Sequence, residues 1–314
     1  AEALHRSLGA WARAALDVDS RASVAWAGRD PQRAERLFEE SLAQLRKVGG
    51  RRWQGAVLTN LGTLRLQRNE LAAAERDLTE ARAHFQAESF AGPEAQVLAL
   101  LATLHRRRGD WEEASRCAGE AVRRTRALGD RPGEGKALAT VAAIDLGLGR
   151  AEEASRGFDE ARAVFAELGD HHRRTGATGN CGLALLQLER SAAARSALEE
   201  AVEAAERGGW TAMEGAFRGA LGEALADLGE QDAAWVELAR GEALLRDAGA
   251  LAELGKLMAR RGRLQARSGE ASSATDTLSE LESLAEQTGS GSGSELMAAV
   301  ESLRRTLDTA PVEG

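Results

Sequence analysis

Apolar positions recur along this chain with a period of 40 residues. Alanine stands at one point of the period in seven consecutive units, and we call these alanines the anchors. The anchors are Ala34, Ala74, Ala114, Ala154, Ala194, Ala234 and Ala274. Four residues after the anchor the chain carries a large apolar residue in six of the seven units, and seven residues after it a small residue, also in six. A fixed period across seven units indicates an internal structural repeat.

The spacing within one unit predicts two packed helices. Positions 0, 4 and 7 counted from the anchor share one face of an α-helix, whereas a strand would alternate at every second residue. Twelve residues before the anchor, a small residue marks an earlier helix: Gly62, Ala102, Ala142, Gly182, Gly222 and Gly262. We therefore predict helix–turn–helix hairpins whose small residues let the two helices approach closely.

Helix ends are also marked in the sequence. Fifteen residues after the anchor stands glycine in six units and Ser89 in the remaining one, at the place where a helix C-cap needs a positive φ. Asp110 and Glu113 have the spacing of a capping box at the start of a second helix. Pro132 fits the first turn of another helix.

The positions that recur at a fixed distance from the anchor, which we call columns, resemble those of the tetratricopeptide repeat (TPR). Leu61-Gly62, Ala74, Leu78 and Ala81 reproduce the family pattern in order, and the 40-residue spacing is similar to that of the long-helix variety in Pins-type scaffolds and bacterial signalling proteins. The resemblance implies an all-α fold, a right-handed α-α superhelical solenoid. The chain departs from the family where tyrosine usually stands, nine residues before the anchor. Here the column reads Arg65, His105, Asp145, Leu185, Leu225 and Gln265.

The repeat divides the chain into four segments. Residues 10–289 hold the seven repeats, and Leu8-Gly9 has the helix-end pattern, so we expect residues 1–9 to be the end of a truncated preceding repeat in a longer protein. A glycine–serine run at residues 289–294 ends the repeats. It leads into the segment 290–309, where an apolar stripe after the run predicts a helix that caps the last repeat. Residues 310–314 are expected to be a loose tail.

Composition narrows the function classes. The chain has 314 residues with a formal net charge of −8, which argues against a nucleic-acid groove. We find no apolar run near the roughly 18 residues that a membrane span needs, so we expect a cytoplasmic protein that does not bind membranes. Two cysteines, Cys117 and Cys181, are too few for a secreted disulfide framework.

The sequence shows none of the catalytic motifs that we considered, so we do not expect an enzyme. We find neither a His-Glu-x-x-His zinc helix nor a Cys-x-x-Cys pair. The adjacent His171 and His172 diverge on a helix, so a shared metal is not expected. Cys117 is expected to lie away from any base, and Cys181 to be a small core residue. We therefore expect no catalytic residue, no cofactor and no metal.

The family resemblance places function in a concave groove lined by the first helix of each repeat. In related proteins an asparagine fourteen residues before the anchor, here Asn60 and Asn180, binds a peptide backbone, because an amide both donates and accepts; alternatively, these asparagines are exposed or cap a loop. Lys256-x-x-x-Arg260 resembles half of the carboxylate clamp of chaperone-binding members; alternatively, it is a solvated basic helix that pairs with neighbouring carboxylates. The candidate groove residues are Asn60, Gln96, Arg106, Lys136, Asn180, Glu223, Asp227, Lys256, Arg260 and Arg263.

Two functions remain open from the sequence. The first is a protein-interaction scaffold that binds a protein or peptide partner in its groove, as the C-terminal part of a larger signalling or regulatory protein. The second is a ligand-sensing module, in which a small molecule or peptide in the groove controls an upstream effector domain such as a kinase or transcription regulator.

Overall fold

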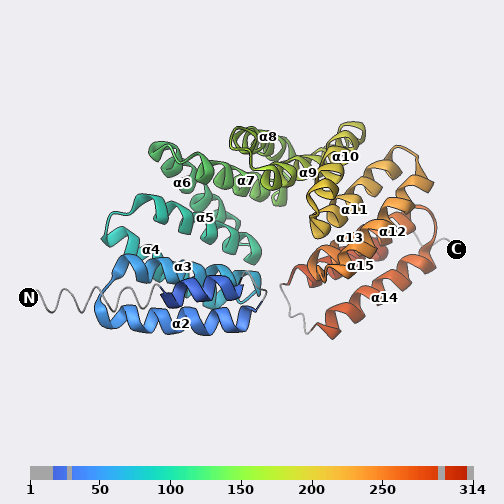
Figure 1. Cartoon of the computed structure of the whole chain (residues 1–314). Coiled ribbons are helices and arrows are strands. Elements are labelled where there is room, and N and C mark those ends of the chain that lie inside the picture. Colours follow the sequence, from blue (N-terminus) through green and yellow to red (C-terminus); the bar gives the residue numbers. More distant parts are fainter. Residues whose placement is uncertain (1–16, 27–29, 289–293, 310–314) are drawn as a thin grey trace, which may run out of the picture. The chain divides into compact units, whose positions relative to one another are not determined.

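The computed structural model describes residues 17–26, 30–288 and 294–309, and these residues form only α-helices and tight turns (Figure 1). The predicted truncated repeat at residues 1–9, most of the glycine–serine run and the tail at 310–314 lie outside the described residues. Two compact units are present, residues 1–140 and 141–314, called here the N-terminal and C-terminal units. The predicted all-α repeat fold is confirmed.

Each repeat pairs a first helix with a second helix. The first repeat begins with the helix at residues 17–26. The later first helices are α3 (Arg51–Gln67), α5 (Ala91–Arg108), α7 (Arg131–Gly147), α9 (His171–Gln187), α11 (Thr211–Asp227) and α13 (Leu251–Arg267). The second helices are α2 (Pro31–Val48), α4 (Leu71–Ala87), α6 (Trp111–Leu128), α8 (Ala151–Glu167), α10 (Ser191–Gly208), α12 (Gln231–Asp247) and α14 (Ala271–Gln287). A last helix, α15 (Glu295–Thr309), follows them.

The anchor column lies where the paired helices touch. All seven anchors are 0% exposed. The glycine twelve residues before the anchor faces the large residue four after it: a Cβ added at Gly182 would lie 2.7 Å from Leu198 Cγ, and one at Gly222 2.8 Å from Leu238 Cγ. A side chain at these glycines would collide with a buried leucine, so the predicted close approach is confirmed.

The predicted helix ends are confirmed at the turns and wrong at one cap. Gly129 has a φ of +65°, and Ser89 adopts the same left-handed conformation at +57°. The Asp110 side chain, by contrast, accepts no hydrogen bond from the helix that it precedes. Glu113 pairs with Arg116 instead. The capping box at Asp110 and Glu113 is therefore wrong, because the Asp110 side chain makes no cap hydrogen bond and Glu113 pairs with Arg116.

The seventh repeat is packed differently from the second, fifth and sixth repeats, which also have glycine twelve residues before the anchor. Leu303 of α15 lies against Gly262, where a Cβ would be 2.6 Å from its side chain. In the fifth and sixth repeats the leucine of the repeat's own second helix holds that place. Leu296, Val300 and Leu303 are all buried. The apolar stripe of α15 thus covers α13 at the site that α14 leaves open.

Candidate functional site

The candidates of the N-terminal unit lie on three first helices. Asn60, on α3, is half-buried, and its Nδ2 donates to Asp19 Oδ1 at 3.4 Å. Burial raises the pKa of Asp19, and this hydrogen bond opposes the shift. Arg106 is half-buried on α5, whereas Gln96 on α5 and Lys136 on α7 are exposed. Asn60 is therefore tied to the first helix of the preceding repeat, at residues 17–26.

The C-terminal unit gathers five charged side chains of α11 and α13, which we call the basic cluster. Arg260 Nε lies 2.7 Å from Glu223 Oε2, and a nitrogen of Arg267 lies 2.7 Å from Asp227 Oδ1. Arg263 has weaker partners, Glu223 Oε1 at 3.9 Å and Ser302 Oγ at 3.4 Å. The expected pairing between the basic helix and the neighbouring carboxylates is confirmed.

Four of the five side chains of the basic cluster line a cavity of about 70 Å³. Its lining residues are Glu223, Leu238, Arg260, Arg263, Leu264 and Arg267. Burial would raise the pKa of Glu223, but Arg260 and Arg263 outweigh it and hold that pKa below its ordinary value. Burial, with Arg260 and Arg267 nearby, lowers the pKa of the Arg263 guanidinium. Three guanidiniums against two carboxylates leave one positive charge in excess, and Arg263 is the least compensated.

The half-clamp suggested by Lys256 and Arg260 is already filled by the chain itself. Lys256 Nζ lies 2.8 Å from Glu253 Oε1 and 2.9 Å from Glu295 Oε2 of α15. Burial would lower the pKa of Lys256, but the two carboxylates raise it. Sequence reasoning missed Glu295, because only the packing of α15 on α13 brings it to Lys256.

Asn180 differs from Asn60. It occupies the same column on α9, half-buried, and its side chain makes no hydrogen bond with the part of the chain that the structure describes. An amide without an internal partner can donate to and accept from one peptide unit of a bound chain. Asn180 and the basic cluster both lie on first helices of the C-terminal unit.

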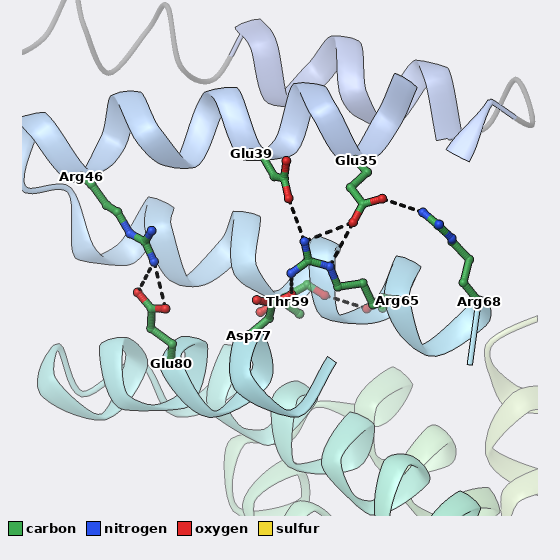
Figure 2. A network of polar contacts seen from close by, with 9 residues as sticks. Glu35, Glu39, Arg46, Thr59, Arg65, Arg68, Asp77 and Glu80 are labelled. Carbon is green, nitrogen blue, oxygen red and sulfur yellow. Dashed lines mark hydrogen bonds and ion pairs between the residues drawn. The ribbon is translucent and has the colours of Figure 1, made fainter. Parts of the chain in front are cut away.

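In the second repeat, the residue that replaces the family tyrosine is Arg65, and it pairs with the second helix of the same repeat. Arg65 binds Asp77 at 2.6 Å, and also Glu39 at 2.8 Å and Glu35 at 3.1 Å on α2 (Figure 2). Burial raises the pKa of Asp77, and Arg65 opposes the shift. Arg65 therefore joins α2, α3 and α4 through one polar network (Figure 2).

In the third repeat, the positions of Arg65 and Asp77 are occupied by His105 and Cys117. A ring nitrogen of His105 and Sγ of Cys117 lie within 4.8 Å of one another. The expectation that Cys117 lies away from any base is wrong, because α5 and α6 pack antiparallel and bring the imidazole beside the thiol.

Comparison with known proteins identifies the fold. No family model and no curated protein matches the chain. Aspartyl phosphate phosphatase F from Bacillus subtilis is similar in structure with a TM-score of 0.72 and 14% identity, over 85% of this chain and 69% of that one. The Rap conjugation gene regulator of plasmid pLS20, in complex with the Phr* peptide, gives 0.68 and 14%, over 93% and 75%.

A third similar structure contains tetratricopeptide repeats. It is a signal transduction ATPase with numerous domains, a STAND protein with a tetratricopeptide repeat sensor, from Pyrococcus horikoshii. The TM-score is 0.63 with 14% identity, over 94% of this chain and 44% of that one. Among the described residues, no helix is both long and apolar enough to cross a membrane. With the anchors, the glycine column and the helix pairs observed, the chain is an array of tetratricopeptide-type repeats.

Proposed function

We propose that this chain is a protein-interaction scaffold that binds a protein or peptide partner on the first helices of its repeats. The observation that carries the proposal is the basic cluster, where charged first-helix side chains of α11 and α13 surround a cavity and leave one positive charge in excess. An anionic group of a partner fits this place. We assign the interaction to the cytoplasm as part of the same proposal.

A carboxylate of the partner would bind Arg263. A guanidinium presents a planar fork that binds a carboxylate through two parallel hydrogen bonds. Arg263 has no carboxylate closer than 3.9 Å among the described residues, whereas Arg260 and Arg267 each hold one at 2.7 Å. A terminal or side-chain carboxylate would complete the site, and Asn180 would bind the peptide backbone.

The similar structures support this function. The conjugation regulator was solved with a peptide bound, and the STAND protein carries its repeats as a sensor in a chain of which this array spans 44%. We propose the same context here, an array within a larger signalling or regulatory protein.

A peptide array rich in acidic side chains and free terminal carboxylates tests the proposal. Peptides that bind the wild type should bind Arg263→Ala and Asn180→Ala at least about tenfold more weakly. Arg123→Ala is the matched control, because Arg123 is an exposed arginine on a second helix, and its affinity should be unchanged. Binding that both test variants retain, or turnover of a substrate by the purified chain, would contradict the proposal.

Ligand sensing is the second candidate, favoured by the peptide in the conjugation regulator. A sensor predicts that a bound peptide changes the radius of gyration in small-angle X-ray scattering. A scaffold predicts binding with an unchanged radius.

A further inference from the structure

Three side chains of different chemistry gather between α5 and α6. His105 lies on α5, and Glu113 and Cys117 lie on α6. One nitrogen of the imidazole, the Cys117 Sγ and one Glu113 carboxylate oxygen all lie within 4.8 Å of one another. Cys117 is buried, His105 half-buried and Glu113 exposed, so the cluster reaches from the helix contact to the solvent.

The repeat itself builds this cluster. The position nine before the anchor faces the position three after it, as Arg65 and Asp77 at 2.6 Å and Gln265 and Thr277 at 2.7 Å show in two other repeats. In the third repeat the same two positions carry His105 and Cys117. Glu113 stands one helical turn before Cys117, on the same face of α6.

One polar atom of the cluster has no partner. Nδ1 of His105 is buried and makes no hydrogen bond. The nearest charged group is the Asp110 carboxylate, whose Oδ2 lies 3.6 Å away. A buried nitrogen without a partner costs free energy that a bound ligand or a small shift of the imidazole would recover. Asp110, which does not cap its helix, is placed to hold the imidazole by a hydrogen bond, as carboxylates commonly do for metal-binding histidines.

We propose that His105, Glu113 and Cys117 form a zinc site. Thiolate, imidazole and carboxylate are the three ligand types that zinc takes in proteins, whereas calcium and magnesium prefer oxygen alone. Zinc ligands lie about 2.0–2.3 Å from the ion, so the side chains would have to draw together around it. Solvent at Glu113 leaves a fourth position open to water.

Positive side chains face the cluster and must yield to the ion. Arg116 hydrogen-bonds Glu113 from the same helix, and Arg82 of α4 lies near enough to act on the Cys117 thiol. Arg116 is 59% exposed, so its exchange for zinc costs little. Removing Arg116 should therefore tighten zinc binding, whereas removing a ligand should weaken it.

The full chain, reduced and stripped of metal with a chelator, tests the site by competition for Zn²⁺ with a chromophoric chelator. We expect one equivalent bound by the wild type. Cys117→Ser and His105→Gln should weaken binding at least about tenfold, and Arg116→Ala should strengthen it. Cys181→Ser is the matched control, because Cys181 is the other buried cysteine and contacts Ser155 on α8.

Binding of Co²⁺ distinguishes a cysteine that ligates the metal from a cysteine that only packs in the fold. Co²⁺ should produce a thiolate-to-metal charge-transfer band in the wild type and Cys181→Ser, and none in Cys117→Ser. The proposal is overturned if the wild type binds no zinc, if Cys117→Ser and His105→Gln bind as tightly as the wild type, or if Cys181→Ser alone abolishes the band. A site confirmed in this way would replace the sequence-based expectation that the chain holds no metal.

Discussion

The glycine twelve residues before the anchor gives a sharp test of the helix contact. Gly222 lies inside α11, where a Cβ would approach Leu238 Cγ to 2.8 Å and the carbonyl oxygen of Ala234 to 3.0 Å. Leu238 is 2% exposed, and the carbonyl belongs to the backbone of α12, so neither moves aside easily. We expect Gly222→Ala to overpack the helix pair at a cost of about 2–3 kcal/mol.

Helix propensity acts in the opposite direction. Alanine is more stable than glycine inside a helix by about 1 kcal/mol, so the net loss should be about 1–2 kcal/mol. Gly176→Ala is the matched control. Gly176 lies inside α9 of the same unit, and the nearest atom to its Cβ would be Met213 Cε at 3.8 Å, an ordinary van der Waals distance. This variant should gain about 1 kcal/mol.

Urea unfolding followed by far-UV circular dichroism measures both variants. Their unfolding free energies should differ by about 2–3 kcal/mol, with Gly176→Ala above the wild type and Gly222→Ala below it. If Gly222→Ala is as stable as Gly176→Ala, the glycine column does not lie at the contact between the paired helices.

Four other predictions concern stability. Ala154→Leu, at a fully buried anchor, should cost about 1–3 kcal/mol in urea unfolding, and a neutral result would remove the anchor from the contact. Ser89→Gly should gain about 1 kcal/mol by relieving a positive φ, and Gly129→Ser should lose a similar amount; equal stability of all three proteins would contradict this. Leu303→Ala, fully buried in α15, should cost about 2–5 kcal/mol, and hydrogen exchange in α13 should rise; unchanged exchange would mean that α15 does not cover α13. The pKa of Glu223 lies below its ordinary value of 4.5, so the ionised carboxylate stabilises the fold above that pH, and this stabilisation is lost as the pH falls through the lowered folded pKa. Glu223→Gln should therefore reduce the unfolding free energy near neutral pH more than in acid. A difference that does not depend on pH would contradict the pairing.

The sequence was sufficient to predict the parts of the fold that repeat. Ala194, Leu198 and Gly182 recur at fixed offsets because each repeat must bury the same contact. A 40-residue period therefore determines which residues are small, which are large and which end a helix. The cross-helix ion pair of Glu223 and Arg260 was also within reach, since both positions lie on first helices of neighbouring repeats.

Contacts that occur once were harder to predict. His105 and Cys117 lie on different helices, and a distance between two helices follows from their packing rather than from spacing along either one. Arg65 and Asp77 occupy the same two columns in the second repeat and have opposite charge, so they indicated that these columns face each other. The partner of Lys256 could not be predicted either, because Glu295 depends on how α15 packs after the glycine–serine run.

Hydrogen–deuterium exchange with and without a bound peptide shows directly whether a partner binds the first helices of the repeats. A helix that contacts the peptide opens less often, so its backbone amide hydrogens exchange more slowly. We predict slower exchange in α9, α11 and α13, which carry Asn180 and the basic cluster. Slower exchange confined to the second helices α10, α12 and α14 would contradict it.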